Sequence, residues 1–376
     1  MRTAPRVLAA LLLASALGGC GSDDDGDSGG DDAATGASSS APTSVPEVLD
    51  VGRPVALAED GEGRLLVAHL VEEGPRESVA AAWRLEDADG ETIAEGPGRQ
   101  VRNESSIPGI WPLADGFLVD LGGNGRYERL DGEGELTPVE EVDTPRPLAA
   151  GDVAVEGARG VYSPQDETIA PTPRLPGGAV AVELVLDPEG GAWALPEASD
   201  AGTTMLHLPV GRTTWEESAL ELPGGGYPVG LEVTEDLVVV PVARSRGAGD
   251  RLDALLVRAR TGEEAAWRRL PAPSDLGSSW FSASVAGLPD GRLLVFDDVD
   301  VARVVDPVAE TWEVLALPEG QGGRDHGWVL EVAGDRLYAL DWVDGAAYAS
   351  TGSLDDLGSD PSASADSGSG WREVSG

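Results

Sequence analysis

The chain of 376 residues contains one cysteine, no lysine and few aromatic residues, which make up 5% of it. With a single cysteine it cannot form an intramolecular disulfide, so its stability must come from packing. All 26 basic residues are arginines, and they stand against 67 acidic residues, which gives a formal net charge of −41. This excess of negative charge makes nucleic acid and anionic lipid headgroups poor partners.

The N-terminal apolar run is too short to span a bilayer. It covers Val7 to Leu17, about 11 residues, whereas a membrane-spanning helix needs about 20. Arg2 and Arg6 precede it and small residues follow it. This order is typical of a cleaved export signal.

The apolar run ends in the string Leu17-Gly18-Gly19-Cys20. The string resembles the lipobox of bacterial lipoproteins, and the absence of lysine indicates the GC-rich genome typical of actinobacteria. The resemblance implies a signal peptide over residues 1–19 and diacylglycerol attached to Cys20. We therefore expect the protein to be lipid-anchored at the extracytoplasmic face of the cell membrane.

Residues 20–45 contain a run of aspartates and a Ser-rich tract without apolar periodicity. Such a segment cannot bury a core, so we expect a disordered tether there. Flexible carboxylates without fixed geometry bind Ca²⁺ weakly, so this run predicts no metal site. A single folded domain is expected over residues 46–376.

The expected folded domain consists of short apolar runs separated by glycine, proline and aspartate, with 51 glycines and 27 prolines in the whole chain. Groups of runs recur as strand, tight Asp/Gly turn, apolar strand, third strand and a strand bearing a tryptophan. Trp215, Trp267 and Trp312 repeat at a spacing of roughly 50 residues. Four strands per unit at this period are typical of a β-propeller blade, so the fold class is all-β.

The repeat predicts seven blades of four antiparallel strands, near residues 52–98, 107–141, 146–177, 178–223, 227–272, 279–318 and 326–375. About 330 residues then give ~47 per blade, within the range of propeller families. The third unit is short and the first two lack a late tryptophan, so six or eight blades stay open. Innermost strands should be continuous apolar runs, as in Val180–Leu186 and Leu237–Val240.

Near the C-terminus the chain carries the pattern Ser-x-Asp-x-Gly-x-x-Trp in Ser364, Asp366, Gly368 and Trp371. The pattern resembles the Asp-box of sialidase-type BNR propellers, and residues 304–312 and 322–328 resemble parts of kelch repeats. The Asp-box resemblance implies a structural turn on the outer rim, with a tryptophan that wedges between blades. Both resemblances support the architecture rather than an activity.

The motifs of enzymes and metal sites are incomplete. A sialidase-type enzyme would carry Arg-Ile-Pro near its N-terminus, and here Ser106 stands in place of the arginine. His69, His207 and His326 fall in different units, and none has a second histidine or cysteine at the spacing of zinc ligands, so the sequence does not indicate a zinc site. Asp297-Asp-Val-Asp300 lacks the loop pattern of a calcium site. We therefore predict no catalytic residue, metal or cofactor.

The sequence favours a monomeric, non-enzymatic binding or scaffold module with an unidentified protein or glycan ligand at the propeller face. A third hypothesis is an accessory lipoprotein of an envelope complex. The alternative is a sialidase-type glycoside hydrolase acting on envelope or host glycans. Its nucleophile would come from a tyrosine paired with a glutamate such as Glu232, and the candidates are Tyr127, Tyr162, Tyr227, Tyr338 and Tyr348.

Overall fold

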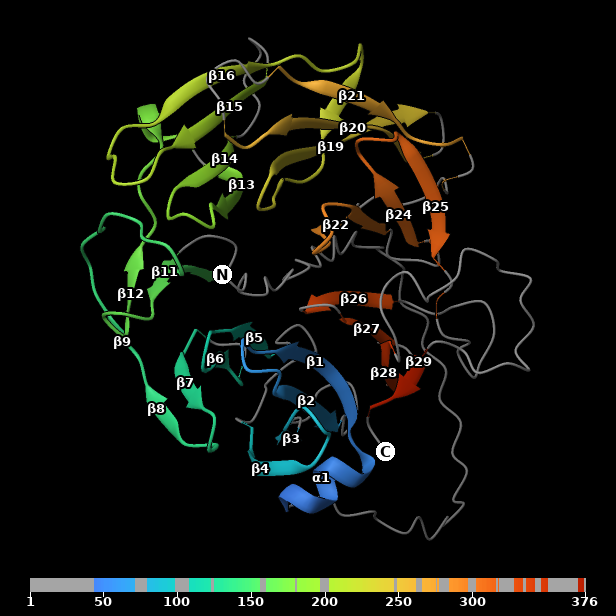
Figure 1. The fold of residues 1–376 in the computed structure, drawn as a ribbon. Coiled ribbons are helices and arrows are strands. Elements are labelled where there is room, and N and C mark those ends of the chain that lie inside the picture. Colours follow the sequence, from blue (N-terminus) through green and yellow to red (C-terminus); the bar gives the residue numbers. More distant parts are fainter. Residues whose placement is uncertain are drawn as a thin grey trace, which may run out of the picture.

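The structure is a computed structural model that describes residues 44–71, 80–98, 108–122, 125–155, 160–179, 181–196, 203–246, 249–261, 266–274, 276, 284–296, 302–315, 317, 328–333, 336–341, 346–350 and 371–374. Within these ranges the chain forms seven β-sheets arranged in a ring (Figure 1). The prediction of a seven-bladed β-propeller is therefore confirmed, and six or eight blades are excluded.

The blades follow one another along the chain. Blade 1 is formed by β1 (Arg53–Glu59), β2 (Leu65–Val71), β3 (Ala80–Glu86) and β4 (Thr92–Pro97). Blade 2 is formed by β5 (Gly109–Pro112), β6 (Gly116–Asp120), β7 (Glu128–Asp131) and β8 (Leu136–Pro138). Blade 3 is formed by β10 (Val153–Val155), β11 (Gly160–Ser163), β12 (Thr168–Pro171) and β9 (Glu140–Glu141).

Among the remaining blades, blade 5 contains the two longest described strands. Blade 4 is formed by β13 (Ala181–Leu186), β14 (Ala192–Pro196), β15 (Thr203–Leu208) and β16 (Glu216–Leu220). Blade 5 is formed by β17 (Gly226–Pro228), β18 (Glu232–Val233), β19 (Leu237–Arg246), β20 (Gly249–Ala259) and β21 (Arg268–Pro271). Blade 6 is formed by β22 (Ser284–Gly287), β23 (Leu293–Phe296), β24 (Ala302–Asp306) and β25 (Thr311–Leu315). Blade 7 is formed by β26 (Trp328–Ala333), β27 (Arg336–Asp341), β28 (Ala346–Ser350) and β29 (Trp371–Glu373).

Two details of the predicted blades were wrong. Residues 140–141 were assigned to the second blade, but β9 pairs in parallel with β12 and forms the outer edge of blade 3. This explains why the third repeat looked short, since its fourth strand precedes it in the chain. Leu237–Val240 was predicted to be innermost, but it lies on β19, the second strand, and β17 and β18 occupy the inner edge of that blade.

The core is divided into layers between neighbouring blades. Each of the seven junctions has its own cluster of buried apolar side chains. At the last junction, Leu57 and Val67 of blade 1 pack with Tyr338 and Leu340 of blade 7. No strand is shared between these two blades within the described ranges, so the contact that closes the ring there is made by side chains.

A short helix precedes blade 1. α1 (Val45–Val51) lies at the periphery of the ring and packs through Val48 and Leu49 against Ala82 of β3 (Figure 1). The sequence analysis did not predict it, although Ser44-Val-Pro-Glu47 carries a helix-start pattern, and the Ser44 N–H donates to Glu47 Oε2 at 3.1 Å. None of the helices in the described part of the chain is long and apolar enough to cross a bilayer.

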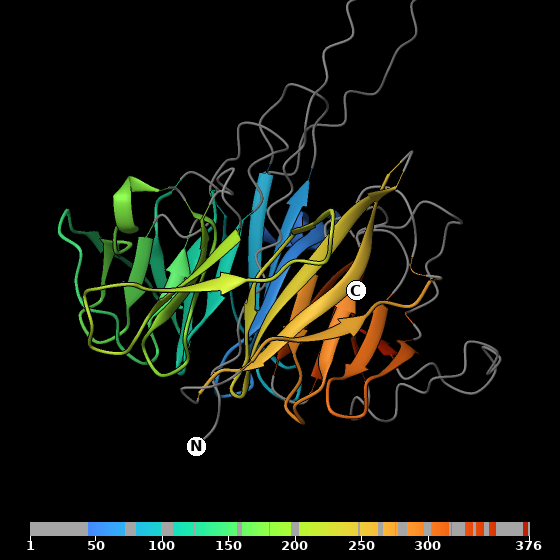
Figure 2. The same ribbon diagram turned by 90° about the horizontal axis from the view of Figure 1, so that it is seen from above.

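Five hairpins use the same five-residue turn, and all five lie on one face of the ring because they join first to second or third to fourth strands. We call this face the turn face; Figure 2 shows the ring from the side. The fourth residue of each turn is a glycine with positive φ, a conformation that costs other residues energy: Gly63, Gly90, Gly134, Gly190 and Gly291. In four of the turns the first residue is an aspartate whose Oδ1 accepts the N–H of the third residue at 2.9 Å.

A matched pair of substitutions tests how these turns pack. Gly90 and Gly190 have φ of 84° and 100°, but only at Gly190 would a Cβ meet other backbone, at 2.5 Å from the Ala149 carbonyl carbon. We expect Gly90→Ala to lower the free energy of unfolding by about 1–2 kcal/mol, the cost of the left-handed conformation. Gly190→Ala should lose a further ~1–3 kcal/mol through overpacking. Urea unfolding measures both, and equal losses would contradict the packing of this turn against Ala149.

Candidate functional site

At the junction of blades 4 and 5, close to the turn face, two arginines meet two indole rings and an imidazole ring. Trp193 of β14 and His207 of β15 are opposite each other in register, and their rings stack with centroids 3.9 Å apart at 14°. From blade 5, the guanidinium carbon of Arg258 lies over the Trp193 ring at 5.3 Å and over the Trp267 ring at 5.5 Å. These distances fit cation–π contacts.

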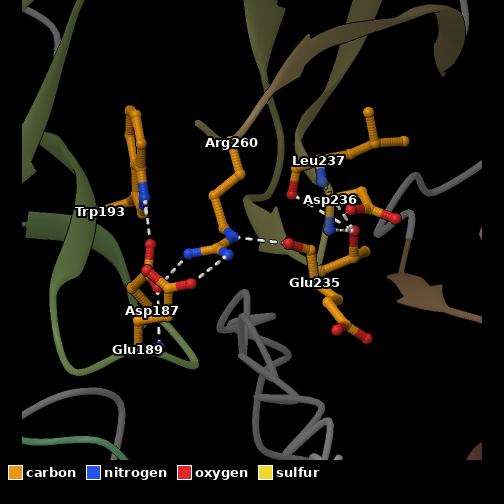
Figure 3. Close-up of polar contacts among 8 residues, drawn as sticks. Asp187, Glu189, Trp193, Glu235, Asp236, Leu237 and Arg260 are labelled. Atoms are coloured by element: carbon orange, nitrogen blue, oxygen red, sulfur yellow. Dashed lines mark hydrogen bonds and ion pairs between the residues drawn. The ribbon is translucent and has the colours of Figure 1, made fainter. Parts of the chain in front are cut away.

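A second arginine ties the two blades together beside this stack (Figure 3). Arg260 Nη1 donates to Asp187 Oδ1 at 2.7 Å, and Nη2 donates to Glu189 Oε1 at 3.1 Å. Its Nε–H donates to the Glu235 carbonyl at 2.6 Å. The side chains of Arg260 and Asp187 are 7% and 6% exposed, so this ion pair is buried.

The turn that begins blade 4 orients Asp187. Its Oδ1 accepts the Glu189 N–H, and its Oδ2 accepts the indole N–H of Trp193 at 3.3 Å. The same carboxylate therefore shapes a hairpin, fixes an indole ring and binds an arginine from the next blade. We call Asp187, Trp193, His207, Arg258, Arg260 and Trp267 together the interblade site.

Burial and the neighbouring charges set the electrostatics of the interblade site. Burial lowers the pKa of His207, with further lowering by Arg258 and Arg260 and opposition from Asp187 and Glu216. His207 is therefore neutral at pH 7. Burial also lowers the pKa of Arg258, but an arginine stays charged at any physiological pH. The site thus presents a permanent cation held against aromatic rings.

Most residues of the predicted sites lie outside the described ranges. These are the lipobox residues Leu17, Gly18 and Gly19, the lipidation residue Cys20, and Ser364, Asp366 and Gly368 of the Asp-box pattern, together with His326, Ser106 and Asp297–Asp300. Trp371 is described, and it packs in the cluster between blades 6 and 7. The ligand-binding residues were left unknown by the sequence analysis.

The described histidines and tyrosines are dispersed around the ring. His69 is buried in blade 1, where burial lowers its pKa and its Nδ1 lies 3.3 Å from the Gly52 carbonyl oxygen. Within the described ranges, no group of three or more histidine, cysteine, aspartate or glutamate residues is arranged to hold a metal ion. The tyrosine hydroxyl of Tyr338 donates to Glu59 Oε2 across the junction of blades 7 and 1.

The sequence analysis did not identify Trp193, Arg258 and Arg260. One signal was available, because Arg258 and Arg260 are separated by one residue at the end of an apolar run and alternate residues of a strand share a face. The residues that contact these two arginines could not be predicted in this way. Trp193 belongs to another blade, and Trp267 was recognised only as part of the blade repeat.

The inner edge of blade 4 carries a glutamate with an altered protonation equilibrium. Glu183 follows a β-bulge on β13, the innermost strand of that blade. Solvent reaches the Glu183 side chain, but protein atoms surround most of it. The resulting loss of hydration raises the pKa of its carboxyl group to about 7. The neighbouring inner strand β18 carries the buried Glu232.

Comparisons with known proteins identify no family. No protein-family model matches the sequence, and no curated protein is significantly similar to it. Among solved structures, puromycin hydrolase S511A mutant complexed with PGG is 16% identical, with a TM-score of 0.46 over 82% of this chain and 54% of that chain. A Mycobacterium tuberculosis puromycin-hydrolyzing peptidase is 15% identical, with a TM-score of 0.44 over 83% and 55%.

A domain that is not named as a hydrolase is also similar. The C-terminal WD40 domain of Sif2 is 13% identical, with a TM-score of 0.39 over 81% of this chain and 83% of that chain. This chain spans about half the length of the puromycin hydrolases it matches. The class of protein rests on the sheet topology itself, which is that of a seven-bladed β-propeller.

Loss of Arg260 would leave Asp187 as a buried, uncompensated carboxylate. We expect Arg260→Gln to lower the free energy of unfolding by about 3–5 kcal/mol, as for other broken buried ion pairs. Arg292→Gln is the matched control, because its pair with Asp290 is 23% and 44% exposed and should be worth only about 0–1 kcal/mol. Urea unfolding at pH 7 measures both variants, and equal small losses would show that the Arg260 contact does not hold the blades together.

The raised pKa of Glu183 makes its effect on stability depend on pH. The group binds a proton more readily folded than unfolded, with a pKa of about 7 against an ordinary 4.5. Below pH 4.5 the group is neutral in both the folded and the unfolded state, so it costs no stability; the cost of its charge grows as the pH rises and is complete above about pH 7. We expect Glu183→Gln to stabilise the protein at pH 8 and to have little effect at pH 4.5. Thermal unfolding across this range measures the difference, and a constant difference would refute the assignment.

Proposed function

We propose that the protein is a lipid-anchored, extracytoplasmic β-propeller that works as a non-enzymatic binding or scaffold module at the cell envelope. The observation that carries the proposal is the closed seven-bladed ring, combined with the Leu17-Gly18-Gly19-Cys20 string that precedes it. α1 is the first described element and lies at the periphery beside blade 1 (Figure 1). A tether from Cys20 would therefore join the domain at its rim.

The polar interblade site supports a binding role rather than a catalytic one. Each nitrogen of the Arg260 guanidinium donates to a carboxylate or carbonyl oxygen, His207 is stacked on an indole ring, and both sets of contacts are structural. General acid–base catalysis needs a titratable group within reach of a substrate proton. The lowered pKa of His207 and its stacking restrict it in that role.

The alternative function is a sialidase-type glycoside hydrolase, and one contact speaks to it. Tyr338 and Glu59 form a tyrosine–glutamate pair with Arg336 nearby, as that chemistry requires. However, Tyr338 is only 2% exposed, and burial raises the pKa of its hydroxyl. A nucleophile needs a lowered pKa or an accessible base, so the pair serves better as a ring-closing contact.

The anchor is tested with the full chain in a bacterium that processes lipoproteins. We expect Cys20→Ser to release the protein from the membrane pellet, because a thioether-linked diacylglycerol is the anchor that the sequence offers. Gly19→Ala is the control, since a small residue still precedes the cysteine and membrane association should persist. Fractionation after a salt wash measures both variants.

Two results would overturn this proposal. A Cys20→Ser protein that still pellets with washed membranes would refute the lipid anchor. Hydrolysis of an aryl α-sialoside by the purified protein, abolished by Tyr338→Phe, would establish the hydrolase instead.

A further inference from the structure

Arg258 has contacts unlike those of the other half-buried arginines whose contacts the structure gives. The side chains of Arg64, Arg84, Arg129, Arg146, Arg244 and Arg260 each bind a carboxylate, and Arg251 donates to the Leu276 carbonyl oxygen. The guanidinium of Arg258 donates to no oxygen of the described residues, and its Nε is buried without an acceptor. Its contacts are with the indole rings of Trp193 and Trp267. In a chain with 67 acidic residues, this lack of a carboxylate partner is unexpected.

The geometry of a guanidinium gives this arrangement a meaning. Aromatic rings contact the faces of the planar group, whereas its five N–H donors lie in the plane and point outward. The contacts of Arg258 with the two indole rings use none of its N–H donors on a described oxygen, so the Nη donors stay available to a ligand. A carboxylate accepts two of these donors in the same plane, so it can bind without displacing either indole.

The solvent access of Arg258 and the charges around it indicate the charge of the ligand that it would bind. The side chain is partly exposed, so a ligand from solution can reach it. Among the described residues, Asp187, Glu189 and Glu216 are acidic groups of the interblade site and its edge, and two of them already bind Arg260. These carboxylates would repel a phosphate dianion about twice as strongly as a monoanion. The neighbouring indole of Trp267 offers apolar surface to the rest of the ligand.

We propose that Arg258, held against Trp193 and Trp267, binds the carboxylate group of a small monoanionic ligand between blades 4 and 5. The inference rests on the proposed function, because it names the ligand class of that binding module. An acidic sugar and a peptide carboxyl terminus share this chemistry. Arg258 supplies the in-plane donors, and Trp267 packs against the ring or side chain beside the carboxylate.

The test is a fluorescence titration, because two tryptophans adjoin the site. The full chain carrying Cys20→Ser is titrated with sodium glucuronate and with N-acetylalanine, and the uncharged controls are glucose and N-acetylalanine amide. We expect one of the two carboxylates to give a saturable change that its uncharged control does not give. The acid that binds identifies the source of the carboxylate as sugar or peptide.

Three variants separate the site from bulk charge. Arg258→Gln should weaken binding by about 10-fold or more, as expected for loss of a charge-assisted pair. Arg258→Lys keeps the charge but loses the planar fork, and it should weaken binding several-fold. Arg212→Gln removes an exposed arginine of blade 4 and should bind as the parent does. Thermal unfolding establishes that each variant is folded, and if Arg258→Gln is not, the Arg258→Lys result decides.

Two outcomes would overturn the inference. One is the absence of a saturable response to both acids, and the other is unchanged binding in every folded Arg258 variant. Neither outcome bears on the lipid anchor, which fractionation of Cys20→Ser tests independently. A protein that is anchored but binds neither acid would refute this inference and leave the proposed function standing.

Discussion

The structure depends on covering both faces of every sheet. The inner and middle strands are apolar on both sides, as in β19, where residues 238–240 are all fully buried. Such a sheet cannot remain in water with a bare face, so each blade requires two neighbours and the row of blades must close into a ring. Here β1 meets β26, β27 and β28 through side chains, and Leu57, Val67, Tyr338 and Leu340 form the last layer. Because the strands of each blade come from nearly contiguous chain, the sheets can form locally while the closing layer joins residues some 280 positions apart.

At the junction of blades 4 and 5 the buried layer also contains charged side chains. Two arginines that lie two positions apart in the chain, Arg258 and Arg260, have their charges compensated in different ways. Arg260 is buried, and three oxygens compensate its charge and its donors. Arg258 lies over two indole rings and donates to no oxygen of the described residues. A cation–π contact supplies about 0.5–2 kcal/mol, less than the desolvation of a buried ion costs, so partial exposure is what makes Arg258 tolerable in this position. The exposure that stability requires is also the access that a ligand requires.

Much of the fold could be predicted because its signals are local. The Asp/Gly turns and the recurring tryptophans fixed the number of blades and the outer strands of blades 4 to 6, since both depend on residues close in sequence. The parallel pairing of β9 with β12 could not be predicted, because Glu140 and Glu141 have no pattern that distinguishes an outer strand of one blade from the next. The interblade site could not be predicted for the same reason. Trp193 and Arg258 are 65 positions apart and meet only because adjacent blades bring β14 and β20 together.

The overall charge decides which anions could use a site such as Arg258. At physiological ionic strength a charge is screened beyond about 8 Å, so a small ligand at Arg258 responds to the nearest groups rather than to the net charge of −41. A polyanion such as nucleic acid extends over many screening lengths and meets the acidic surface along its whole length. The net charge therefore opposes the binding of polyanions, and it does not oppose the binding of a single carboxylate that we propose at Arg258. Added salt would weaken the Arg258 contact directly and reduce the repulsion from Asp187 and Glu189 at the same time, so the salt dependence of carboxylate binding should be shallow, in contrast to the steep dependence of a protein that neutralises many phosphates.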